Sequence, residues 1–379
     1  MSTDPSRTAA RRRDRRVYLR SHPFLFALLA ATRGRPVRRL GRTLLVHDAD
    51  AYREALTRLP LDRTAAGTTG GAARAAGAGG VLFDQEGAVH RAERRGLAVG
   101  LGAAGVEELR AVWRPLLVRR LAPLARGGEV DLVELARELS GSVVCALLGS
   151  PADPRAVAGA AAEAASASVR SHLPGPRRPR AEATATRTAD RLRRLLGAGT
   201  DARHDPAASP GSGAVEDGLA AMLAVAAVNT TVAALPRAVA WCADAGLWEQ
   251  AADARLRPAL VDELLRVTAA SPLLPRVAAA GGVVGGRPVR GGDRLLLVAR
   301  HAAEAHRRDP DAHRPAAPGT GRLVFGAGPH ACPGARLAHV QLADVLEELA
   351  PYRPVVTRAR VDRRAALPGW RSLTVRAGA

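Results

Sequence analysis

The segment from Val215 to Trp248 limits most strongly how this chain can fold. It is rich in alanine and valine, and as a helix it has apolar residues on every side. A helix that is apolar all round must be buried among other elements. We therefore expect it to run through the middle of the protein, with a kink at Pro236, which lacks a backbone N–H.

The rest of the chain also favours helix. Its 379 residues can bury a large core, and alanine and leucine are strong helix formers, whereas isoleucine is absent. Periodicity predicts a mainly α protein with minor β structure. The expected helices cover 21–33, 49–56, 103–149 with a break near 127–128, two within 154–198, 256–268 and 335–350. We expect a hairpin from 36–40 and 43–48, and short strands within 281–298.

The segments that interrupt this pattern suggest the domain organisation. Residues 1–20 contain a dense arginine run and are predicted to be a basic, flexible tail, followed by one domain over 21–379. The glycine-rich residues 64–80 are predicted to be a mobile loop, and 201–213 a linker.

Charge and cysteine content restrict the environment and the partners. The net charge is +20, and all 56 basic side chains are arginine, which favours an acidic partner. No aromatic residues interleave with this charge, so we do not expect a nucleic-acid partner. Three distant cysteines suit a reducing compartment. The apolar run at 22–32 is too short to span a membrane. We therefore expect a cytoplasmic monomer without a membrane partner.

The loop at 325–337, FGAGPHACPGARL, places Cys332 directly before a predicted helix. A thiolate there is stabilised by free backbone N–H groups at the helix start. Its glycines, at 326, 328 and 334, allow the backbone to approach a bound group closely. On this pattern alone, a buried structural cysteine is an equally good interpretation.

Three further pairs have helical or buried settings. Glu263 and Arg266 are spaced i, i+3, and His90 and Arg94 are spaced i, i+4, so each pair shares a helix face. Taken singly, each pair is better explained by a solvated surface. Asn229 is the only asparagine of the chain, and it precedes Thr230 inside the apolar helix. Buried polar groups need partners or a cavity, which favours a functional role.

In this order, the four elements resemble those of a cytochrome P-450, a haem-thiolate oxygenase. The loop matches the family signature F-G-x-G-x-H-x-C-x-G completely, at Phe325, Gly326, Gly328, His330, Cys332 and Gly334. The glutamate–arginine pair and the histidine–arginine pair fall about where the family places them. The resemblance implies a triangular helical domain with small β-sheets and haem b between a long central helix and a C-terminal helix.

The resemblance also implies roles for individual residues. Cys332 would be the axial thiolate of the haem iron, within the loop of Phe325, Gly326 and Gly334, with Phe325 packed on the sulfur side. The two haem propionates would be bound by His90, Arg94, Arg276 and His330. Glu263 and Arg266 would form a buried structural ion pair, with Arg314 as its third member.

On the oxygen side, Thr230 would help to deliver protons. The acid that the family usually places before this threonine is Asn229 here, which cannot relay a proton as a carboxylate does. The resemblance implies an apolar substrate pocket lined by Leu82, Phe83, Met222, Ala226, Leu273, Leu274 and Val277.

The function implied is oxidation of a small organic molecule by dioxygen, a monooxygenation such as hydroxylation in bacterial secondary metabolism. Electrons would come from outside, because no flavin or nicotinamide fingerprint is present. An acidic ferredoxin with its reductase, or an acidic carrier protein bearing the substrate, would suit the basic surface. Two alternatives stay open: oxidative coupling or cyclisation without oxygen transfer at the same haem site, and a non-catalytic basic haem- or nucleic-acid-binding protein.

Overall fold

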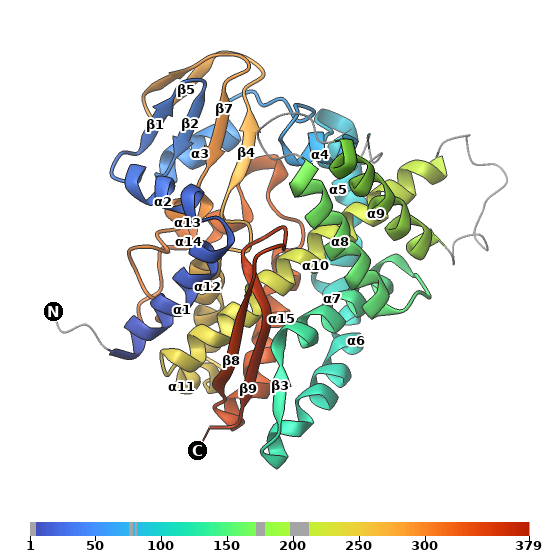
Figure 1. Cartoon of the computed structure of the whole chain (residues 1–379), viewed down its shortest axis with the longest axis vertical. Coiled ribbons are helices and arrows are strands. Elements are labelled where there is room, and N and C mark those ends of the chain that lie inside the picture. Colours follow the sequence, from blue (N-terminus) through green and yellow to red (C-terminus); the bar gives the residue numbers. More distant parts are fainter. Residues whose placement is uncertain (1–4, 76–78, 80–81, 172–178, 198–211, 379) are drawn as a thin grey trace.

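The centre of the molecule is the long helix α10, Ser212–Asp244 (Figure 1). The computed structural model describes residues 5–75, 79, 82–171, 179–197 and 212–378. Helix α10 packs against α7 (Leu132–Leu148), α8 (Pro154–Ser171) and α9 (Pro179–Gly197). By length and composition alone, Asp217–Asp244 could also cross a membrane. Its packing against three helices instead fits the predicted buried central helix.

The end of this helix differs from the prediction. Helix α10 continues through Pro236 and ends at Asp244 rather than at Trp248. Gly246 has a φ of 65°, a left-handed conformation that glycine adopts without steric cost, so the chain turns there. Trp248 then begins the short helix α11 (Trp248–Ala252). The kink expected at Pro236 stays a prediction.

The remaining helices surround α10, and five of them, α2, α3, α6, α12 and α15, lie within or close to predicted ranges. They are α1 (Pro5–Ser21), α2 (Pro23–Thr32), α3 (Ala49–Thr57), α4 (Thr69–Ala75), α5 (Gly87–Leu101), α6 (Ala103–Leu121), α12 (Arg257–Thr268), α13 (Ala299–Ala302), α14 (Pro318–Gly321) and α15 (Ala335–Leu349). Short 3-10 turns are η1 (Ala122–Arg126), η3 (Arg322–Phe325), η4 (Gly328–His330) and η5 (Ala350–Tyr352). The predicted start of α3 is confirmed, because the Asp48 side chain accepts hydrogen bonds from the amides of Asp50 and Ala51.

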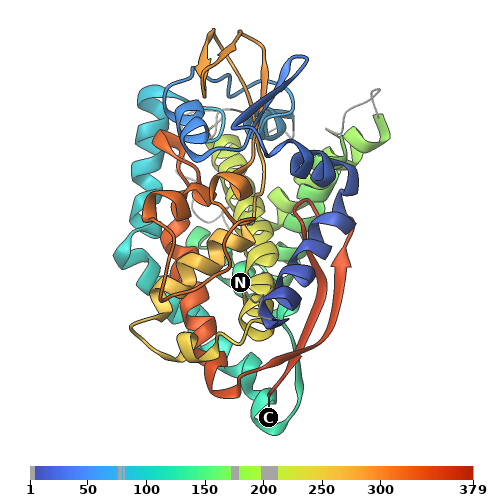
Figure 2. The same cartoon turned by 90° about the vertical axis from the view of Figure 1, so that its left-hand side faces the viewer.

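The strands form three small sheets at the edges of the helical body (Figures 1 and 2). The first has the order β1-β2-β7-β4, the second β3-β9-β8 and the third β5-β6. Their bounds are β1 (Val37–Leu40), β2 (Thr43–Val46), β3 (Glu129–Asp131), β4 (Leu274–Val277), β5 (Gly282–Val284), β6 (Arg287–Val289), β7 (Arg294–Leu297), β8 (Val355–Asp362) and β9 (Gly369–Arg376). The predicted hairpin of β1 and β2 is confirmed, with Val37 opposite Val46. The β8–β9 hairpin was not predicted.

The prediction of a flexible tail over residues 1–20 is wrong for residues 5–20, which form most of α1. This helix buries Ala10, Val17 and Tyr18, and its Asp14 accepts two hydrogen bonds from Arg237 of α10. The many arginines conceal this buried side in the sequence. Because several of them pair with acids of the body, the helix is held in place. That residues 21–379 form a single domain stays a prediction.

The glycine-rich segment is also more structured than expected. Residues 69–75 form α4, which follows a turn in which Thr68 Oγ1 donates to the Ala65 carbonyl and accepts from the Gly71 amide. A Cβ at Gly70 or Gly71 would lie 2.2 Å or less from a backbone oxygen, so these glycines serve close packing. The prediction of a mobile loop over 64–80 is therefore wrong for 69–75. The predicted linker over 201–213 lies outside the described residues up to 211.

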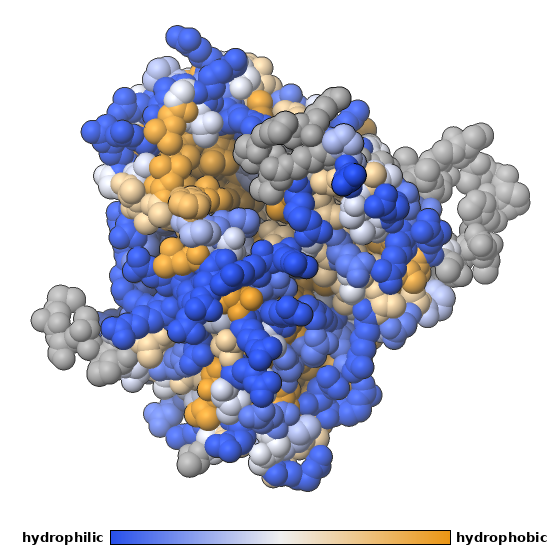
Figure 3. Space-filling view, in the orientation of Figure 1, coloured by the Kyte–Doolittle hydropathy of each residue, from blue (hydrophilic) through white to orange (hydrophobic). Residues whose placement is uncertain are grey.

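One face of the molecule has separate hydrophilic and apolar areas. In Figure 3 a hydrophilic band crosses the face over α1 and the β8–β9 hairpin, and apolar residues gather above it over α2 and the neighbouring strands. The two elements under the band are adjacent, since α1 packs against both β8 and β9. Figures 1 and 2 show them side by side.

Candidate active site

A cavity of about 800 Å³ lies between α10, α5, β4, α15 and the loop that carries Cys332. Most of the side chains that line it are apolar. It brings together nearly all the residues that the sequence predicted for one site. They are Leu82, Phe83, His90, Arg94, Met222, Ala226, Asn229, Thr230, Leu273, Leu274, Arg276, Phe325, Gly326, His330, Cys332 and Gly334.

The cysteine loop is shaped by its glycines. Gly326 and Gly328 have φ values of 79° and 71°, conformations that residues with a Cβ rarely adopt. The amide of Cys332 donates to the carbonyl of Phe325 over 2.8 Å, which closes the loop. Helix α15 begins three residues after the cysteine. The loop therefore presents Cys332 from a rigid turn at the cavity wall.

The Cys332 side chain lines the cavity and is accessible from it. Its enclosed position raises the pKa of the thiol, while a hydrogen bond from the Gly334 amide and the nearby Arg94 act to lower that pKa. The other two cysteines, Cys145 and Cys242, are buried, and burial raises their pKa values. Cys332 is thus the one thiol among the described residues that faces the cavity.

Cationic side chains gather at one side of this cavity. The His90 and His330 rings stack with centroids 3.9 Å apart, and Arg94 Nη1 donates to the Ala331 carbonyl over 2.6 Å. Arg276 comes from β4, and its Nη1 donates to the carbonyl of Pro275. Two buried atoms here, His90 Nε2 and Arg276 Nε, have no hydrogen-bond partner. Unpaired buried donors are costly, so this arrangement suits a bound acceptor.

Arg63 belongs to the same cluster and was missed by the sequence analysis. It lines the cavity, and its Nε donates to Glu86 Oε1 over 3.2 Å. No motif marks it, because it lies in the loop after α3 and reaches the cluster only through the tertiary fold. The ion pair gives no signal in the sequence either, because its partner Glu86 lies 23 residues away.

Burial, and secondly the charges of neighbouring basic groups, lower the pKa values in this cluster. Burial lowers the pKa of His330 to about 3, assisted by the charges of Arg63, His90, Arg276 and Arg94. Burial, followed by the charge of Arg63, lowers the pKa of Arg276 to about 10. Burial also lowers the pKa of His90, as do Arg94 and Arg63. A bound dianion would relieve this repulsion.

These residues fit a haem. The cluster of Arg63, His90, Arg94, Arg276 and His330 would hold the two propionates, and its unpaired donors are suited to carboxylate oxygens. Cys332 would ligate the iron from the loop. Within the described part of the chain, no three His, Cys, Asp or Glu side chains are grouped to hold a metal ion on their own. A single thiolate below an apolar cavity is the donor set that a haem-thiolate site uses.

Thr230 and Asn229 line the cavity from α10, but their polar hydrogens point away from it. Thr230 Oγ1 donates to the Ala226 carbonyl of its own helix over 2.7 Å. Asn229 Nδ2 donates to the Val225 carbonyl over 2.8 Å and to the Ala161 carbonyl of α8 over 3.3 Å. Because both partners are acceptors, the amide orientation is fixed, and Asn229 Oδ1 is left as an acceptor.

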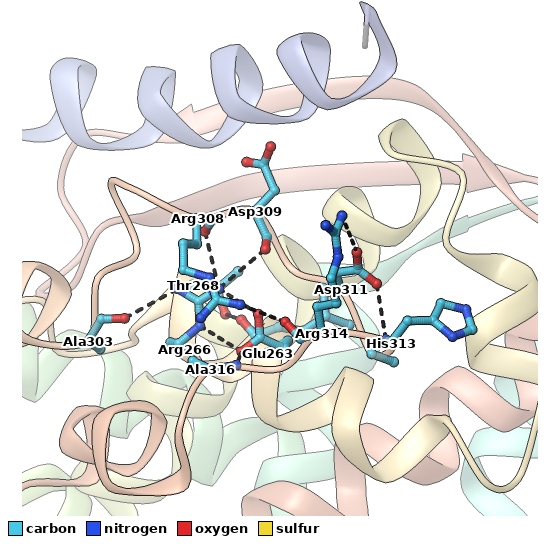
Figure 4. A network of polar contacts seen from close by, with 12 residues as sticks. Glu263, Arg266, Thr268, Ala303, Arg308, Asp309, Asp311, His313, Arg314 and Ala316 are labelled. Atoms are coloured by element: carbon cyan, nitrogen blue, oxygen red, sulfur yellow. Dashed lines mark hydrogen bonds and ion pairs between the residues drawn. The ribbon is translucent and has the colours of Figure 1, made fainter. Parts of the chain in front are cut away.

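The predicted pair of Glu263 and Arg266 is present and buried (Figure 4). Arg266 Nε and Nη2 donate to the two carboxylate oxygens over 2.9 and 2.6 Å. Arg266 also donates to the carbonyls of Ala303 and Arg308, and the Ala316 amide donates to Glu263. The pair thus fastens α12 to the segment between α13 and α14.

Two predicted residues are placed differently. Arg314 is not the third member of this pair: its side chain is 80% exposed and lies 3.6 Å from Asp311 (Figure 4). Backbone carbonyls take the place expected for it. Val277 does not line the cavity, unlike the other six predicted pocket residues. It follows Arg276 on β4, and because successive side chains of a strand point to opposite faces, Val277 turns away.

Known proteins resemble this chain in sequence and in fold. The 20-oxo-5-O-mycaminosyltylactone 23-monooxygenase of Streptomyces fradiae is 37% identical over 131 residues, which is 32% of this chain and 30% of that protein. The chain spans about a third of the length of the curated relatives it matches. No family model matches the chain.

The solved structures match over nearly the whole chain. The mycinamicin VIII C21 methyl hydroxylase MycCI of Micromonospora griseorubida, bound to mycinamicin VIII, has a TM-score of 0.67 and 25% identity, covering 92% of this chain and 95% of that one. Cytochrome P-450 BioI, in complex with an acyl carrier protein ligated to hexadec-9Z-enoic acid, has a TM-score of 0.75 and 17% identity, covering 95% and 100%. The expected cytochrome P-450 fold is confirmed, and the partial sequence matches, together with the cysteine loop and its cavity, support membership of the cytochrome P-450 superfamily.

Proposed function

We propose that this protein is a haem-thiolate monooxygenase that inserts one oxygen atom of dioxygen into a small organic molecule of bacterial secondary metabolism. The observation that carries the proposal is the shared cavity. It joins the one cavity-facing thiol among the described residues, a basic cluster in which His90 Nε2 and Arg276 Nε lack partners, and an apolar space that Thr230 also lines. Relatives in sequence include hydroxylases named for macrolide substrates, which supports this class of substrate.

The residues that line the cavity have two roles: some would hold the cofactor, and others would hold the substrate. Bound haem b supplies dioxygen activation, which thiolate donation favours. The cationic cluster orients the cofactor, and the Cys332 loop holds the sulfur in a fixed position. Leu82, Met222 and Leu274 exclude water and hold an apolar substrate. Thr230 can hold a proton at Oγ1, and it must rotate away from the Ala226 carbonyl to present that proton to the cavity.

The reduced carbon monoxide spectrum tests the haem-thiolate site. The protein should show the red-shifted Soret band of a thiolate-ligated haem, and Cys332→Ala should lose it. Cys242→Ala is the matched control, because Cys242 is fully buried away from the cavity. A band that is absent from the native protein, or that survives in Cys332→Ala, contradicts the proposal.

A second candidate keeps the haem site and changes the outcome to oxidative coupling or cyclisation without oxygen transfer. Asn229 favours it, because both of its N–H groups are engaged and its Oδ1 cannot donate. Among the described residues that line the cavity, Asp62 is the only acid. Hydrogen bonds from Thr64 lower the pKa of Asp62, so it is ionised. Turnover under isotopically labelled dioxygen distinguishes the two, since a coupling product carries no label.

The finer features of this function rest on the same proposal. Electrons would come from an acidic ferredoxin and its reductase, or the substrate would arrive on an acidic carrier protein. We propose a cytoplasmic monomer without a nucleic-acid or membrane partner. The alternative of a non-catalytic haem- or nucleic-acid-binding protein predicts steep, salt-dependent DNA binding together with no electron uptake from a ferredoxin.

A further inference from the structure

More than half of the net charge of this protein lies on two adjacent elements. Helix α1 has seven arginines and one aspartate, and the β8–β9 hairpin has six arginines and one aspartate. Together they carry a surplus of eleven positive charges, against +20 for the whole chain. The two elements pack against each other, and they underlie the hydrophilic band of Figure 3. The basic surplus is therefore concentrated on one face.

The arginines of α1 fall into two groups. Arg7, Arg11 and Arg13 point toward the body and pair with Asp311, Asp309 and Asp244 respectively. The opposite side of the helix carries Arg12, Arg15, Arg16 and Arg20, which are all exposed. Helical geometry places 12, 16 and 20 in a row, since residues four apart are neighbours on a helix surface.

The outward arginines have no acidic partner among the described residues. We define the arginine face as the exposed side chains of Arg12, Arg15, Arg16 and Arg20 on α1 and of Arg358, Arg360, Arg363, Arg364 and Arg371 on the hairpin. The inward arginines of α1 all pair with carboxylates of the body. The guanidinium fork matches a carboxylate in two hydrogen bonds, which favours an acidic protein as the missing partner.

The arginine face adjoins the active-site cavity. The turn of the hairpin lines that cavity through Ala366, Leu367 and Pro368, directly after Arg363 and Arg364. On the other side, α2 lines it through Leu25 and Phe26, shortly after Arg20. A partner seated on the arginine face would therefore lie next to the part of the cavity wall that α2 and the hairpin turn form. Cys332 belongs instead to the loop before α15, on a different part of the wall.

An apolar contact is available at the same place. Phe24 on α2 is 90% exposed, and Leu28, one turn further on, is 42% exposed. Protein interfaces combine an apolar, often aromatic, centre with a polar rim. Phe24 supplies the apolar part and the arginine face the polar rim. A nucleic-acid surface would instead need charged and base-contacting side chains, and it would not need an exposed apolar side chain on this helix.

We propose that the arginine face docks an acidic carrier protein, which presents a tethered acyl substrate to the cavity between α2 and the hairpin turn. This inference rests on the proposed oxidation and names how its substrate is delivered. The partner is defined by its chemistry: a small acidic protein with carboxylates on its surface and an apolar acyl chain on a flexible arm. The electron donor would bind elsewhere, closer to Cys332.

The test measures binding rather than turnover. The haem-loaded protein is titrated with a fluorescently labelled acyl carrier protein that bears a decanoyl chain. The variant of the arginine face is Arg16→Gln/Arg360→Gln/Arg364→Gln. The matched control is Arg255→Gln/Arg287→Gln/Arg290→Gln, three exposed arginines outside that face whose loss changes the net charge equally. Hydrogen exchange of the complex then maps the docking surface.

We expect the face variant to weaken carrier binding by about tenfold or more and the control by less than about twofold, because the lost charges act at the interface itself. Binding should also weaken with salt. Protection should appear in α1, α2 and the β8–β9 hairpin. Free decanoyl pantetheine should bind equally to the native protein and to both variants.

Several results would overturn the docking inference. They are failure of the carrier to bind, equal effects of the two triple variants, or protection confined to α15 and the cysteine loop. Vesicles containing phosphatidylglycerol, and duplex DNA, are run in parallel. If either polyanion binds through the arginine face and the carrier does not, the face serves that polyanion. Because none of these results depends on the carbon monoxide spectrum, they leave the proposed oxidation intact.

Discussion

The amide of Asn229 has a structural task that a carboxylate cannot perform. One of its N–H groups joins α10 to the Ala161 carbonyl of α8, and the other donates to the Val225 carbonyl within α10. Asn229→Asp would replace two donors by an anion facing two carbonyl oxygens. We expect it to lower the free energy of unfolding by about 1–3 kcal/mol, the cost of leaving such groups unsatisfied. Chemical denaturation of the haem-loaded protein measures this change.

Thr230→Val is the matched control for that substitution. It is nearly isosteric and removes a hydroxyl that bonds only within α10, so its cost should stay below about 1.5 kcal/mol. If Asn229→Asp were as stable as the native protein, the amide would not tether the two helices. The residue would then be a simple replacement for the usual acid.

The pair of Glu263 and Arg266 should be far more sensitive than its exposed neighbours. Both side chains are at most 2% exposed, so Glu263→Gln leaves the Arg266 charge buried without a counter-ion. We expect a loss of about 3–5 kcal/mol in the free energy of unfolding, with reduced haem content on purification. Arg314→Gln should change stability by no more than about 0.5 kcal/mol, because that side chain is exposed. Equal losses in both variants would restore Arg314 to the network.

At the scale of elements, the docking of α1 depends on one buried ion pair. Asp14 accepts from Arg237 Nε over 2.8 Å and from Nη2 over 2.6 Å, and both residues are almost fully buried. Asp14→Asn should cost about 3 kcal/mol, since it leaves the Arg237 charge uncompensated. Faster hydrogen exchange along α1 should accompany the loss. Asp50→Asn removes an exposed pair with Arg53 and should cost no more than about 0.5 kcal/mol. Unchanged exchange in α1 would show that its apolar contacts suffice.

Elements with a strong local signal were predictable, and elements held by distant contacts were not. Helix α3 has an N-cap at Asp48 and an apolar side, so its start could be placed from sequence. Helix α1 also has a buried side, since Ala10, Asp14, Val17 and Tyr18 recur at intervals of three or four. That spacing is visible in the sequence, but the many arginines of the helix obscure it.

The β8–β9 hairpin gives a similar lesson. Arg358, Ala359, Arg360 and Val361 alternate polar with apolar, which is the signal of a half-buried strand. The hairpin completes a sheet with β3, whose three residues carry no pattern of their own. The pairing joins segments more than 200 residues apart, so only the tertiary fold reveals it. Alternation alone would have identified β8.

For the whole molecule, the site was more predictable than its surroundings. The glycines with positive φ that shape the cysteine loop are readable in the sequence. The spaced pairs lie on helices, α5 and α12, as expected. Arg63 could not be predicted, because it enters the cluster from a loop without a motif. The basic charge was known from the sequence, but its concentration on α1 and the hairpin depends on two chain ends meeting in space.

The stability of the whole molecule should fall steeply in acid, because three histidines are held neutral together. His47 Nδ1 and His301 Nδ1 are 2.8 Å apart, and the His301 and His306 rings are 4.7 Å apart. Burial alone lowers the pKa of His47 to about 4. Burial lowers the pKa of His301 to about 2 and that of His306 to about 4, with further contributions from neighbouring cations that include Arg300 and Arg33. The unfolded chain takes up these protons near pH 6.5.

The sign of the effect follows from that difference. Since the unfolded state binds more protons between about pH 6.5 and 4, the free energy of unfolding decreases as pH falls through this range. Each histidine contributes at most about 1.4 kcal/mol per pH unit. Urea denaturation at pH 7.5, 6.0 and 5.0 measures the slope, which His301→Gln should flatten and His313→Gln, at an exposed position, should not. The same slope in His301→Gln as in the native protein would place the acid sensitivity outside this cluster.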